Sequence, residues 1–369
     1  MMILKEKNRA QVQNPELEQE LKEKSARRRK ILRICDRIFG FFLATGIVFA
    51  CAGLALEYVL VKGPSPALRD SFVLTMKETR RFNFINNVFL NNEELEEIYA
   101  SKDTDFEANF DASLITIASQ TEEEDQINPD GSDAYGLVDD DGDGIVMVDI
   151  KGNGFMGYML VVYDPSRIIC GMPDNYGGVG LTLEEMCNKY DAVGGINAGG
   201  FADESGSGLG GVPKGITIVG GECYQRNTHG LPTVGFDENN ILYVGYDYCD
   251  VLEEKGVRDA ASFGPILVMN GERAGDISGS GVNPRTAIGQ RADGAVLMLA
   301  IDGRQTHSIG ATYEDVAEIM LDYGAVNAMN MDGGSSTCMY FEGEYVNKCS
   351  AYGVRPRPLP TSFLIMKED

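Results

Sequence analysis

The chain has 369 residues, 43% of them hydrophobic, and a formal net charge of −24. That length and apolar content suffice for one large globular domain with additional segments. A strongly acidic chain lacks the basic face that binds nucleic acid, so we expect no nucleic-acid partner. The charge is uneven, because residues 1–37 hold eleven basic and six acidic side chains and leave 21 basic and 50 acidic ones in the remainder. Most of the protein is therefore far more acidic than its basic N-terminal tail.

An apolar run over residues 38–61 follows this tail, with Glu57 as its only charged side chain. About 20 apolar residues span a bilayer as a helix, and a buried core helix rarely stays apolar on every face for that length. A cleaved signal peptide has a shorter apolar region, so an uncleaved signal anchor is favoured. The basic cluster at residues 27–30 predicts a cytoplasmic N-terminus, because basic residues stay on the inner side. We expect a single-pass protein of the cell membrane, with the lipid bilayer as a partner and the catalytic domain extracytoplasmic.

Residues 62–143 are expected to form a membrane-proximal spacer. The Gly-Pro-Ser-Pro sequence at residues 63–66 interrupts the apolar helix, and residues 91–100 read as a short capped helix. Between residues 101 and 136 the chain is rich in Asp, Glu, Ser and Asn and has little periodicity, which predicts a loop or a partly disordered tract.

The character of the chain changes at residue 144, where short β-rich runs begin to alternate with Gly-rich turns. Two apolar runs separated by Lys151–Gly154 predict a hairpin. Further strands are predicted over residues 215–219, 241–246, 266–269, 286–290, 295–301 and 325–331, and helices over residues 182–190 and 312–323. We therefore expect an α+β domain over residues 144–369, with a mixed β-sheet and few helices, preceded by the single transmembrane helix.

The helix predicted at residues 312–323 has the clearest signals, with Thr312 as N-cap, acidic residues in its first turn and Gly324 after its end. It joins two predicted strands that end just before Asp302 and Asp332. If these strands are parallel, both acidic side chains lie at one edge of the sheet, where open sheets bind ligands.

Four segments combine glycines with side chains that act on phosphate or sugar: residues 194–201, 283–289, 301–304 and 330–336. One such segment alone is more often an ordinary β-turn. Here Asp332 and the glycines and serines after it follow a strand, so their N–H groups and hydroxyls suit an anion. Arg285 and Arg304 carry the forked donors that match a phosphate oxygen pair.

These segments resemble the phosphodiester glycosidase family, the NAGPA-type domain, from about residue 154 to residue 366. The resemblance rests on Asn-Ala-Gly-Gly-Phe at 197–201, Ser-Phe-Gly-Pro-Ile-Leu at 262–267, Asn-Pro-Arg-Thr at 283–286, Ile-Asp-Gly-Arg at 301–304, Asn-Met-Asp-Gly-Gly-Ser at 330–335 and Arg-Pro-Leu-Pro-Thr at 357–361. The chain has Ala198 and Ser335 where glycine is frequent in the family; both residues are small.

The resemblance implies hydrolysis at the anomeric carbon of a sugar-1-phosphodiester, and bacterial members of the family are often labelled exopolysaccharide-related. The expected catalytic residues are Asp332, then Asp302, with Arg285 stabilising the leaving phosphate. The expected substrate-binding residues are Asn197, Gly199, Gly200, Gly264, Thr286, Arg304, His307, Asn330, Gly333, Gly334, Ser335 and Ser336. The expected partner is a sugar-phosphate or a phosphodiester-linked glycan.

We expect no metal and no cofactor. The Asp139-Asp141-Asp143-Gly144 pattern copies the start of an EF-hand loop, but Ile150 stands where the twelfth position needs Glu, so a solvated acidic turn is favoured. With two histidines in the chain, a histidine-rich metal site is excluded, and no CxxC pair supports a zinc ribbon. The eight cysteines permit disulfides without fixing their pairing.

Two other classes of function remain open at this stage. One is a non-catalytic module that binds envelope glycans or takes part in exopolysaccharide assembly. The other is a glycosidase or transferase that acts on a cell-envelope polymer without a phosphodiester. Two acids beside an anionic ligand argue against pure binding, and convergence of Arg285 and Arg304 on one pocket would favour a phosphate.

Overall fold

The computed structural model describes residues 15–79, 82–100, 109–117, 128, 131–202, 208–226, 231–275, 277, 279–350 and 356–368. Two compact units divide the chain, Met1–Gly63 and Pro64–Asp369. Most of the acidic tract predicted as a loop, residues 101–136, lies outside the described residues, and so does His229.

The first unit is the long helix α2 (Pro15–Lys62). It contains an 18-residue window with a mean hydropathy of 2.2, none of which is buried, so by length and composition it is a candidate membrane span. The span predicted at residues 38–61 lies within this helix, and the helix ends where the Gly-Pro-Ser-Pro sequence begins.

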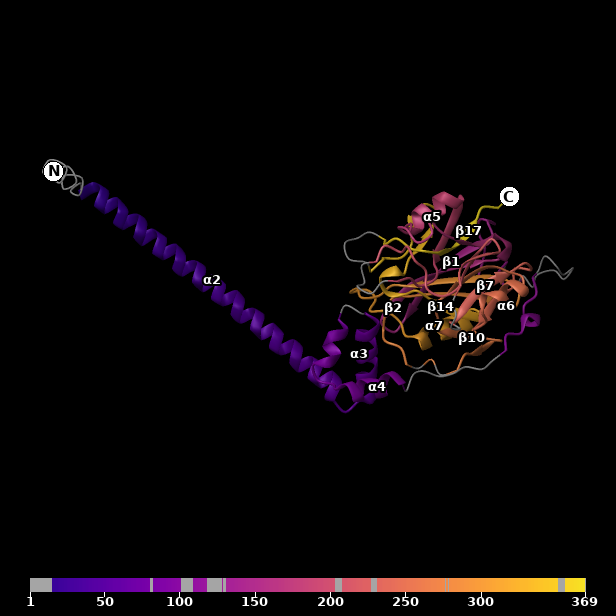
Figure 1. The fold of residues 1–369 in the computed structure, drawn as a ribbon, viewed down its shortest axis with the longest axis horizontal. Helices are drawn as coiled ribbons and strands as arrows, with labels where there is room; N and C mark the ends of the chain where they lie inside the picture. Colours follow the sequence, from indigo (N-terminus) through magenta and orange to yellow (C-terminus); the bar gives the residue numbers. More distant parts are fainter. Residues whose placement is uncertain are drawn as a thin grey trace. The chain divides into compact units, whose positions relative to one another are not determined.

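The second unit begins with short helices (Figure 1): α3 (Pro66–Glu78), η1 (Asn83–Asn87), α4 (Asn92–Ala100) and η2 (Ala112–Leu114). The sequence analysis does not predict α3. Its Ser65 side chain accepts a hydrogen bond from the Leu68 N–H, and Pro66 takes the first helical position, where a missing N–H costs nothing. The predicted helix at residues 91–100 is confirmed, with a reciprocal cap between Asn91 and Glu94.

Three antiparallel sheets form the body of this unit. The largest has the order β1-β2-β13-β12-β14-β10-β11. Its strands are β1 (Ile145–Gly152), β2 (Phe155–Val162), β10 (Ile266–Met269), β11 (Glu272–Arg273), β12 (Arg285–Arg291), β13 (Val296–Ile301) and β14 (Ala325–Met331). The predicted hairpin is confirmed as β1 and β2, and the other predicted strands differ from the observed ones by at most two residues at either end.

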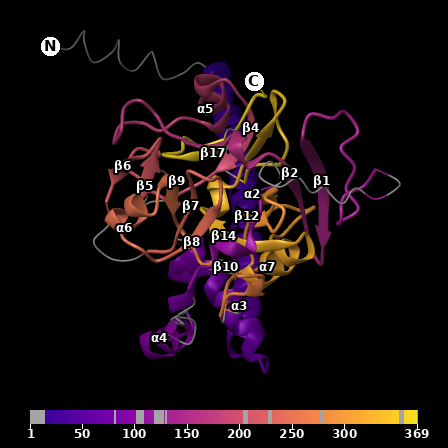
Figure 2. The ribbon, with the colours of Figure 1, turned by 90° about the vertical axis from the view of Figure 1, so that its right-hand side faces the viewer.

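The two smaller sheets have the orders β16-β15-β4-β17-β3 and β6-β5-β9-β7-β8. Strands β5 to β9, which form the second of these sheets, lie together on the left in Figure 2. The strands of the first are β3 (Ile168–Gly171), β4 (Ala192–Asn197), β15 (Met339–Phe341), β16 (Glu344–Tyr345) and β17 (Ser362–Met366). The strands of the second are β5 (Thr217–Val219), β6 (Glu222–Gln225), β7 (Thr233–Asp237), β8 (Leu242–Gly245) and β9 (Val257–Ser262). Two further 3-10 turns among the described residues are η4 (Pro165–Arg167) and η5 (Gly334–Ser336).

Three helices accompany the sheets: α5 (Leu183–Tyr190), α6 (Cys249–Glu254) and α7 (Tyr313–Asp322). The predictions at residues 182–190 and 312–323 are confirmed, each with a capping box at its threonine N-cap. The expectation of only two helices here is wrong, because α6 is also present. It is short and its N-cap Tyr248 makes no side-chain cap bond, so it carries little local signal.

The core lies where one face of the large sheet meets the two smaller sheets. Successive residues of a strand point to opposite faces, and β13 shows this plainly. Val296, Met298 and Ala300 belong to the cluster shared with the smaller sheets. Leu297, Leu299 and Ile301 belong to the cluster on the other face, which also holds Val316 and Met320 of α7. A strand buried on both faces accounts for the continuous apolar sequence of β13.

The strand pair that carries Asp302 and Asp332 is arranged as the sequence analysis anticipates, with one difference. β13 and β14 do not pair with each other; both pair antiparallel with β12, which runs between them. The two outer strands therefore run in the same direction, and their carboxyl ends lie at one edge. Arg285, the first residue of β12, pairs with Ile301 at that edge.

Cysteine pairing is resolved for one pair. Cys223 and Cys249 form a disulfide that joins β6 to the first residue of α6. Cys170, Cys187 and Cys338 are buried thiols, and burial raises the pKa of each. A domain boundary at residue 144 remains a prediction, since α3 and the segment before β1 belong to the same compact unit as the sheets.

A buried ion pair fastens that segment to the large sheet. The Arg291 side chain is 1% exposed and its Nη1 lies 2.6 Å from Asp133 Oδ2, while Asp293 binds a second nitrogen. Tyr135 stacks on the guanidinium at 4.2 Å. Burial raises the pKa of Asp133, but hydrogen bonds from Arg291, Leu137 and Tyr135 outweigh this effect and leave it below the usual value.

We expect the Asp133→Asn variant to lose about 1.5–3 kcal/mol of unfolding free energy at pH 7, the usual range for a hydrogen bond to a charged group. Because the pKa of Asp133 is lowered in the folded state, its contribution is complete above the unfolded value of about 4 and declines as the pH falls below it. Urea unfolding followed by tyrosine circular dichroism measures the difference. An equal difference at pH 7 and pH 3 would contradict this account.

Candidate functional site

A cavity of about 770 Å³ opens beside the edge where β12 begins and β14 ends. Its wall contains residues from the β14 turn, from the loops around β4, β5 and β9, and from α3. The described residues that line it are Thr75, Met76, Glu78, Thr79, Phe82, Gly200, Phe201, Lys214, Leu231, Ser262, Phe263, Asn283, Arg285, Arg304, Tyr313, Asp332, Gly333, Gly334, Ser335, Ser336, Ser350 and Arg357.

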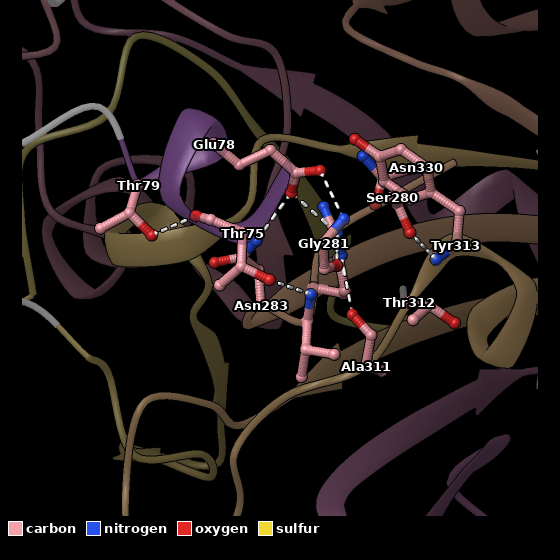
Figure 3. A network of polar contacts seen from close by, with 12 residues as sticks. Thr75, Glu78, Thr79, Ser280, Gly281, Asn283, Ala311, Thr312, Tyr313 and Asn330 are labelled. Atoms are coloured by element: carbon pink, nitrogen blue, oxygen red, sulfur yellow. Dashed lines mark hydrogen bonds and ion pairs between the residues drawn. The ribbon is translucent and has the colours of Figure 1, made fainter. Parts of the chain in front are cut away.

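Arg285 is held rigidly at the base of this wall. It is 3% exposed; its Nε donates to the Ala311 carbonyl at 3.1 Å and its Nη2 to the Gly281 carbonyl at 2.5 Å. Its guanidinium lies 4.1 Å from the Tyr313 ring, and Nη2 is 2.8 Å from Glu78 Oε2. Figure 3 shows Glu78 directed from α3 toward Gly281 and Asn283. The arginine therefore presents a fixed charge to whichever anion occupies this position.

Arg304 lies next to it on the loop after β13. Its backbone has φ 58°, a left-handed conformation that costs a non-glycine residue roughly 1–2 kcal/mol. Its side chain donates to Asn283 Oδ1 at 2.8 Å and to Thr79 Oγ1 at 3.3 Å. Both predicted phosphate-binding arginines thus line the same cavity, the arrangement that favours a phosphate ligand.

The turn after β14 brings Asp332 to the cavity with glycines that allow close packing. The Gly334 N–H donates to the Pro284 carbonyl at 2.9 Å, with φ 63°. A Cβ at Gly334 would lie 3.2 Å from the Arg304 guanidinium, so a side chain here would press on it. Asp332 is partly buried, and the turn continues through Ser335 to the buried Ser336.

Asn197 lies behind this turn, outside the cavity wall of the described residues, at 1% exposure. Its Nδ2 donates to the Asp332 carbonyl at 2.6 Å, and its Oδ1 accepts from Thr286 Oγ1 at 2.7 Å and from the Cys338 N–H at 3.0 Å. One buried amide therefore joins β4, β12 and the Asp332 turn. Thr286 is part of the same buried hydrogen-bond network.

The Asp302 side chain lies outside the described cavity wall, in a separate hydrogen-bond network. It is 2% exposed; its Oδ2 lies 2.8 Å from His307 Nε2, and its Oδ1 accepts from the Lys348 N–H at 2.9 Å and from Asn347 Nδ2 at 3.2 Å. Neither Asp302 nor His307 is among the described residues of the cavity wall. Asp302 follows its strand at the same edge of the sheet as Asp332, but its side chain joins the loops around His307 and Lys348.

The other predicted residues divide in the same way. Gly200, Gly333, Gly334, Ser335 and Ser336 line the cavity, whereas the described wall does not include Gly199, Gly264 or Asn330. Asn330 Nδ2 donates to the Gly264 carbonyl at 2.9 Å and the Gly199 N–H donates to Thr361 Oγ1 at 3.0 Å, so these residues shape the layer beneath.

Several lining residues were missed by the sequence analysis. Glu78 lies in a segment without a glycine-rich motif. Lys214 lies in a glycine-rich stretch, residues 206–215, but that stretch was not among the four segments singled out above. Tyr313 is visible only as the first residue of α7; burial raises the pKa of its hydroxyl to about 12, Arg285 lowers it, and Glu78 and Asp332 raise it further. Arg357 belongs to the closing motif; it stacks on Phe201 at 4.6 Å.

The charge of the cavity wall is opposite to that of the protein. Among the described lining residues four are cationic, Lys214, Arg285, Arg304 and Arg357, and two are acidic, Glu78 and Asp332. In a chain of net charge −24, this concentration of cations favours an anionic ligand at the cavity.

The acidic turn before β1 is remote from these residues in the sequence and binds its own backbone. Asp139 accepts from the Gly142 and Gly144 N–H groups, and Asp143 accepts from Ile145 N–H. The Asp139, Asp141 and Asp143 oxygens lie within 4.8 Å of one another. The self-contained hydrogen bonding is that of an acidic turn.

Comparison with known proteins gives a family model, NAGPA, phosphodiester glycosidase, that matches residues 190–366. The uncharacterised SPbeta prophage-derived protein YomE of Bacillus subtilis (strain 168) is 32% identical over 181 residues, covering 46% of this chain and 27% of that protein. The N-acetylglucosamine-1-phosphodiester alpha-N-acetylglucosaminidase of Bos taurus is 27% identical over 179 residues, covering 44% of this chain and 33% of that protein. The chain thus matches a third or less of the length of these curated relatives.

Among solved structures, the catalytic domain of zebrafish N-acetylglucosamine-1-phosphodiester alpha-N-acetylglucosaminidase, auto-inhibited by its pro-peptide, has the same fold. Its TM-score is 0.51 at 22% identity, and the match covers 61% of this chain and 82% of that one. The matched segment, residues 190–366, contains Arg285, Arg304, Arg357 and the Asp332 turn. Residues 190–366, a little under half of the chain, thus match the NAGPA family of phosphodiester glycosidases.

Proposed function

We propose that this chain is an extracytoplasmic hydrolase that cleaves the glycosidic bond of a sugar-1-phosphodiester in a glycan or glycoconjugate. The observation that carries the proposal is the joint presence of Arg285, Arg304 and Asp332 in the wall of one cavity. The family-model match over residues 190–366 supports the reaction class, and the cationic wall supports an anionic substrate.

In the proposed reaction, the bond between the anomeric carbon and the phosphate ester oxygen breaks. The electron pair goes to the phosphate, which leaves as a monoester, and water adds its oxygen to the anomeric carbon. The two arginines stabilise the charge that develops on the leaving phosphate. Asp332 supplies the carboxylate that an oxocarbenium-like transition state requires, and the proton of the attacking water passes to it or to solvent.

The number of carboxyl groups in the described cavity wall favours a phosphodiester substrate over an ordinary glycoside. Hydrolysis of an ordinary glycoside needs two carboxyl groups, because a poor leaving group must be protonated. In the described cavity wall the acidic residues are Glu78, which is paired with Arg285, and Asp332, to which we assign the catalytic carboxylate. A phosphate leaves without strong general acid catalysis, so fixed arginines replace the second carboxyl group.

The remaining residues take supporting roles in this proposal. Ser335 and Ser336 offer hydroxyls to sugar or phosphate oxygens, and Tyr313 remains a neutral hydrogen-bond donor because its pKa is raised to about 12. Asp302 and His307 hold the loop that carries Arg304 and are positioning residues. Asn197, which ties the Asp332 turn to β4 and β12, is a positioning residue too.

The candidate membrane span supports an extracytoplasmic location for this chemistry. Helix α2 is long and apolar enough to span a bilayer, and all of its basic residues except Lys62 precede residues 38–61. The positive-inside rule then gives a cytoplasmic N-terminus and an outward-facing catalytic domain. The substrate would be a cell-surface or extracellular glycan, and the name of the cattle relative makes N-acetylglucosamine the first sugar to test.

We expect the Asp332→Asn variant to lose roughly 10²–10⁴-fold in sugar release from a nucleotide-sugar, because the amide cannot act as base or stabilise positive charge. The rate at which the full chain in detergent releases N-acetylglucosamine from the nucleotide-sugar measures this loss. Asp149→Asn, an exposed Asp-to-Asn change on β1, is the matched control and should retain full turnover. Wild-type turnover in Asp332→Asn, or equal turnover of an aryl glycoside by the unmodified chain, would contradict the proposal.

We expect the Asn197→Ala variant to lose about 2–3 kcal/mol of unfolding free energy, because two buried donors and one buried acceptor lose their partner. Urea unfolding compared with the unmodified chain measures the loss. An unchanged stability combined with a raised KM would show instead that Asn197 contacts the substrate directly.

A further inference from the structure

Two tyrosines stack on each other at the surface beside β6. Tyr176 lies on the loop after β3 and Tyr224 lies on β6; their ring centroids are 6.1 Å apart, with an angle of 36° between the ring planes. β6 is an edge strand of its sheet (Figure 2), and Tyr224 is 39% exposed. A single exposed ring is ordinary on a protein surface, but two that gather at one place mark a candidate contact surface.

The strand that carries Tyr224 and the ring of Tyr176 are both fixed in place. The disulfide between Cys223 and Cys249 joins β6 to α6, one residue before Tyr224. The Tyr176 hydroxyl donates to Oε1 of Gln225, the next residue on the same strand. Rings that are fixed before a ligand arrives lose little conformational entropy when the ligand packs on them.

Backbone contacts hold the loop that carries Tyr176. The Gly177 N–H donates to the Gly211 carbonyl at 3.0 Å. A Cβ at Gly211 would lie 1.6 Å from the Gly178 carbonyl oxygen, so the two backbones pack too closely for any side chain at this position. The loop is therefore fastened without the Tyr224 ring, and anchoring does not account for the exposure of that ring.

The same backbone contact connects the tyrosine pair with the cavity. Residues 211–214 begin at this loop and end at Lys214, whose N–H donates to the Gly200 carbonyl at 2.8 Å. Lys214 and Gly200 both line the cavity. Three residues of chain span at most about 10 Å, so the loop lies close to the cavity wall. β5 begins shortly afterwards at Thr217, which pairs with Gln225 beside the tyrosines.

The groups around the tyrosine pair suit a sugar ring. A pyranose carries C–H groups on its faces, which pack on aromatic rings, and hydroxyls around its edge, which need hydrogen-bond partners. Glu222 Oε2 accepts from the Tyr224 hydroxyl at 2.9 Å. This bond raises the pKa of Tyr224, and the nearby charge of Lys189 opposes the rise. Apolar ring faces are thus bordered by a carboxylate and an ammonium group that can bind hydroxyls.

We propose that Tyr176 and Tyr224 form a binding platform for a sugar unit of a glycan that extends beyond the cavity. This inference rests on the proposed function for the class of ligand, and it makes the preferred substrate a glycan of several sugar units rather than a free nucleotide-sugar. An exposed tyrosine pair also suits a protein partner. The backbone connection to the cavity favours the glycan, because a chain that leaves the cavity at Lys214 passes next to the pair.

The experiment measures binding of the full chain in detergent to an array of immobilised oligosaccharides of increasing length, with and without phosphate. We expect the affinity of the unmodified chain to rise at least about tenfold from a monosaccharide to the longer oligosaccharides, because the added sugar reaches the tyrosine pair. Tyr224→Ala removes one ring and should lose this rise. Tyr248→Ala removes a ring that is 52% exposed at the start of α6, outside the pair, and should keep it.

A second variant separates the ring of Tyr176 from its hydroxyl. Tyr176→Phe removes the bond to Gln225 and retains the ring, so the rise in affinity with length should stay within about twofold of that of the unmodified chain. Hydrogen exchange supplies an independent readout of where the glycan lies. The longest bound oligosaccharide should slow exchange of residues 222–225 in the unmodified chain, because it covers that strand.

The same rise in affinity in Tyr224→Ala as in the unmodified chain, its loss in Tyr176→Phe, or unchanged exchange of residues 222–225 would each overturn the proposal. Affinity that does not depend on length anywhere on the array would also overturn it, in favour of a protein partner. The proposed function fails separately. If the oligosaccharides bind as expected but the unmodified chain releases no sugar from a nucleotide-sugar, the platform stands and the hydrolase assignment does not. If the unmodified chain hydrolyses the nucleotide-sugar but Tyr224→Ala binds every oligosaccharide as tightly as it does, only the hydrolase assignment stands.

Discussion

The antiparallel pairing of β12 between β13 and β14 is the constraint on which the site depends. Because both neighbours run opposite to β12, their carboxyl ends meet its first residue, Arg285, at one edge of the sheet. The buried Asn197 amide then joins the Asp332 turn to β12 through Thr286. The cations and the acid of the cavity are thus held by the strands beneath them, before any substrate is present.

The two acidic residues at this edge of the sheet have different surroundings, which correspond to a structural role for one and the proposed catalytic role for the other. Asp302 and Asp332 are equivalent in the strand pattern, yet one carboxylate is bound inward by a histidine, an amide and a backbone N–H, and the other faces the cavity. A single carboxylate with two arginines suits a leaving group that is already an anion. The phosphate ester, rather than a second acid, is therefore the feature that makes the proposed reaction possible here.

Local signals predicted the elements well where a cap or a full periodic pattern was present. The capping box of α7 and the apolar alternation of β14 led to correct elements, and the glycine-rich turns located much of the cavity. Ser65 and Pro66 carry the N-cap and first-position signature of α3, but were read only as a helix break. The Glu78–Arg285 contact spans 207 positions, and Asp302 is turned inward by Asn347 and Lys348; no pattern within one segment encodes such long-range pairings.

In the proposed reaction water attacks the sugar carbon and phosphate leaves as a monoester. Hydrolysis of a nucleotide-sugar or a sugar-1-phosphate diester in ¹⁸O-labelled water, followed by mass spectrometry of both products, distinguishes the two bonds that could break. We expect the label to enter the released sugar and to be absent from the phosphate monoester. Label in the phosphate would show cleavage of the phosphorus–oxygen bond and would contradict the assignment of the site as a glycosidase.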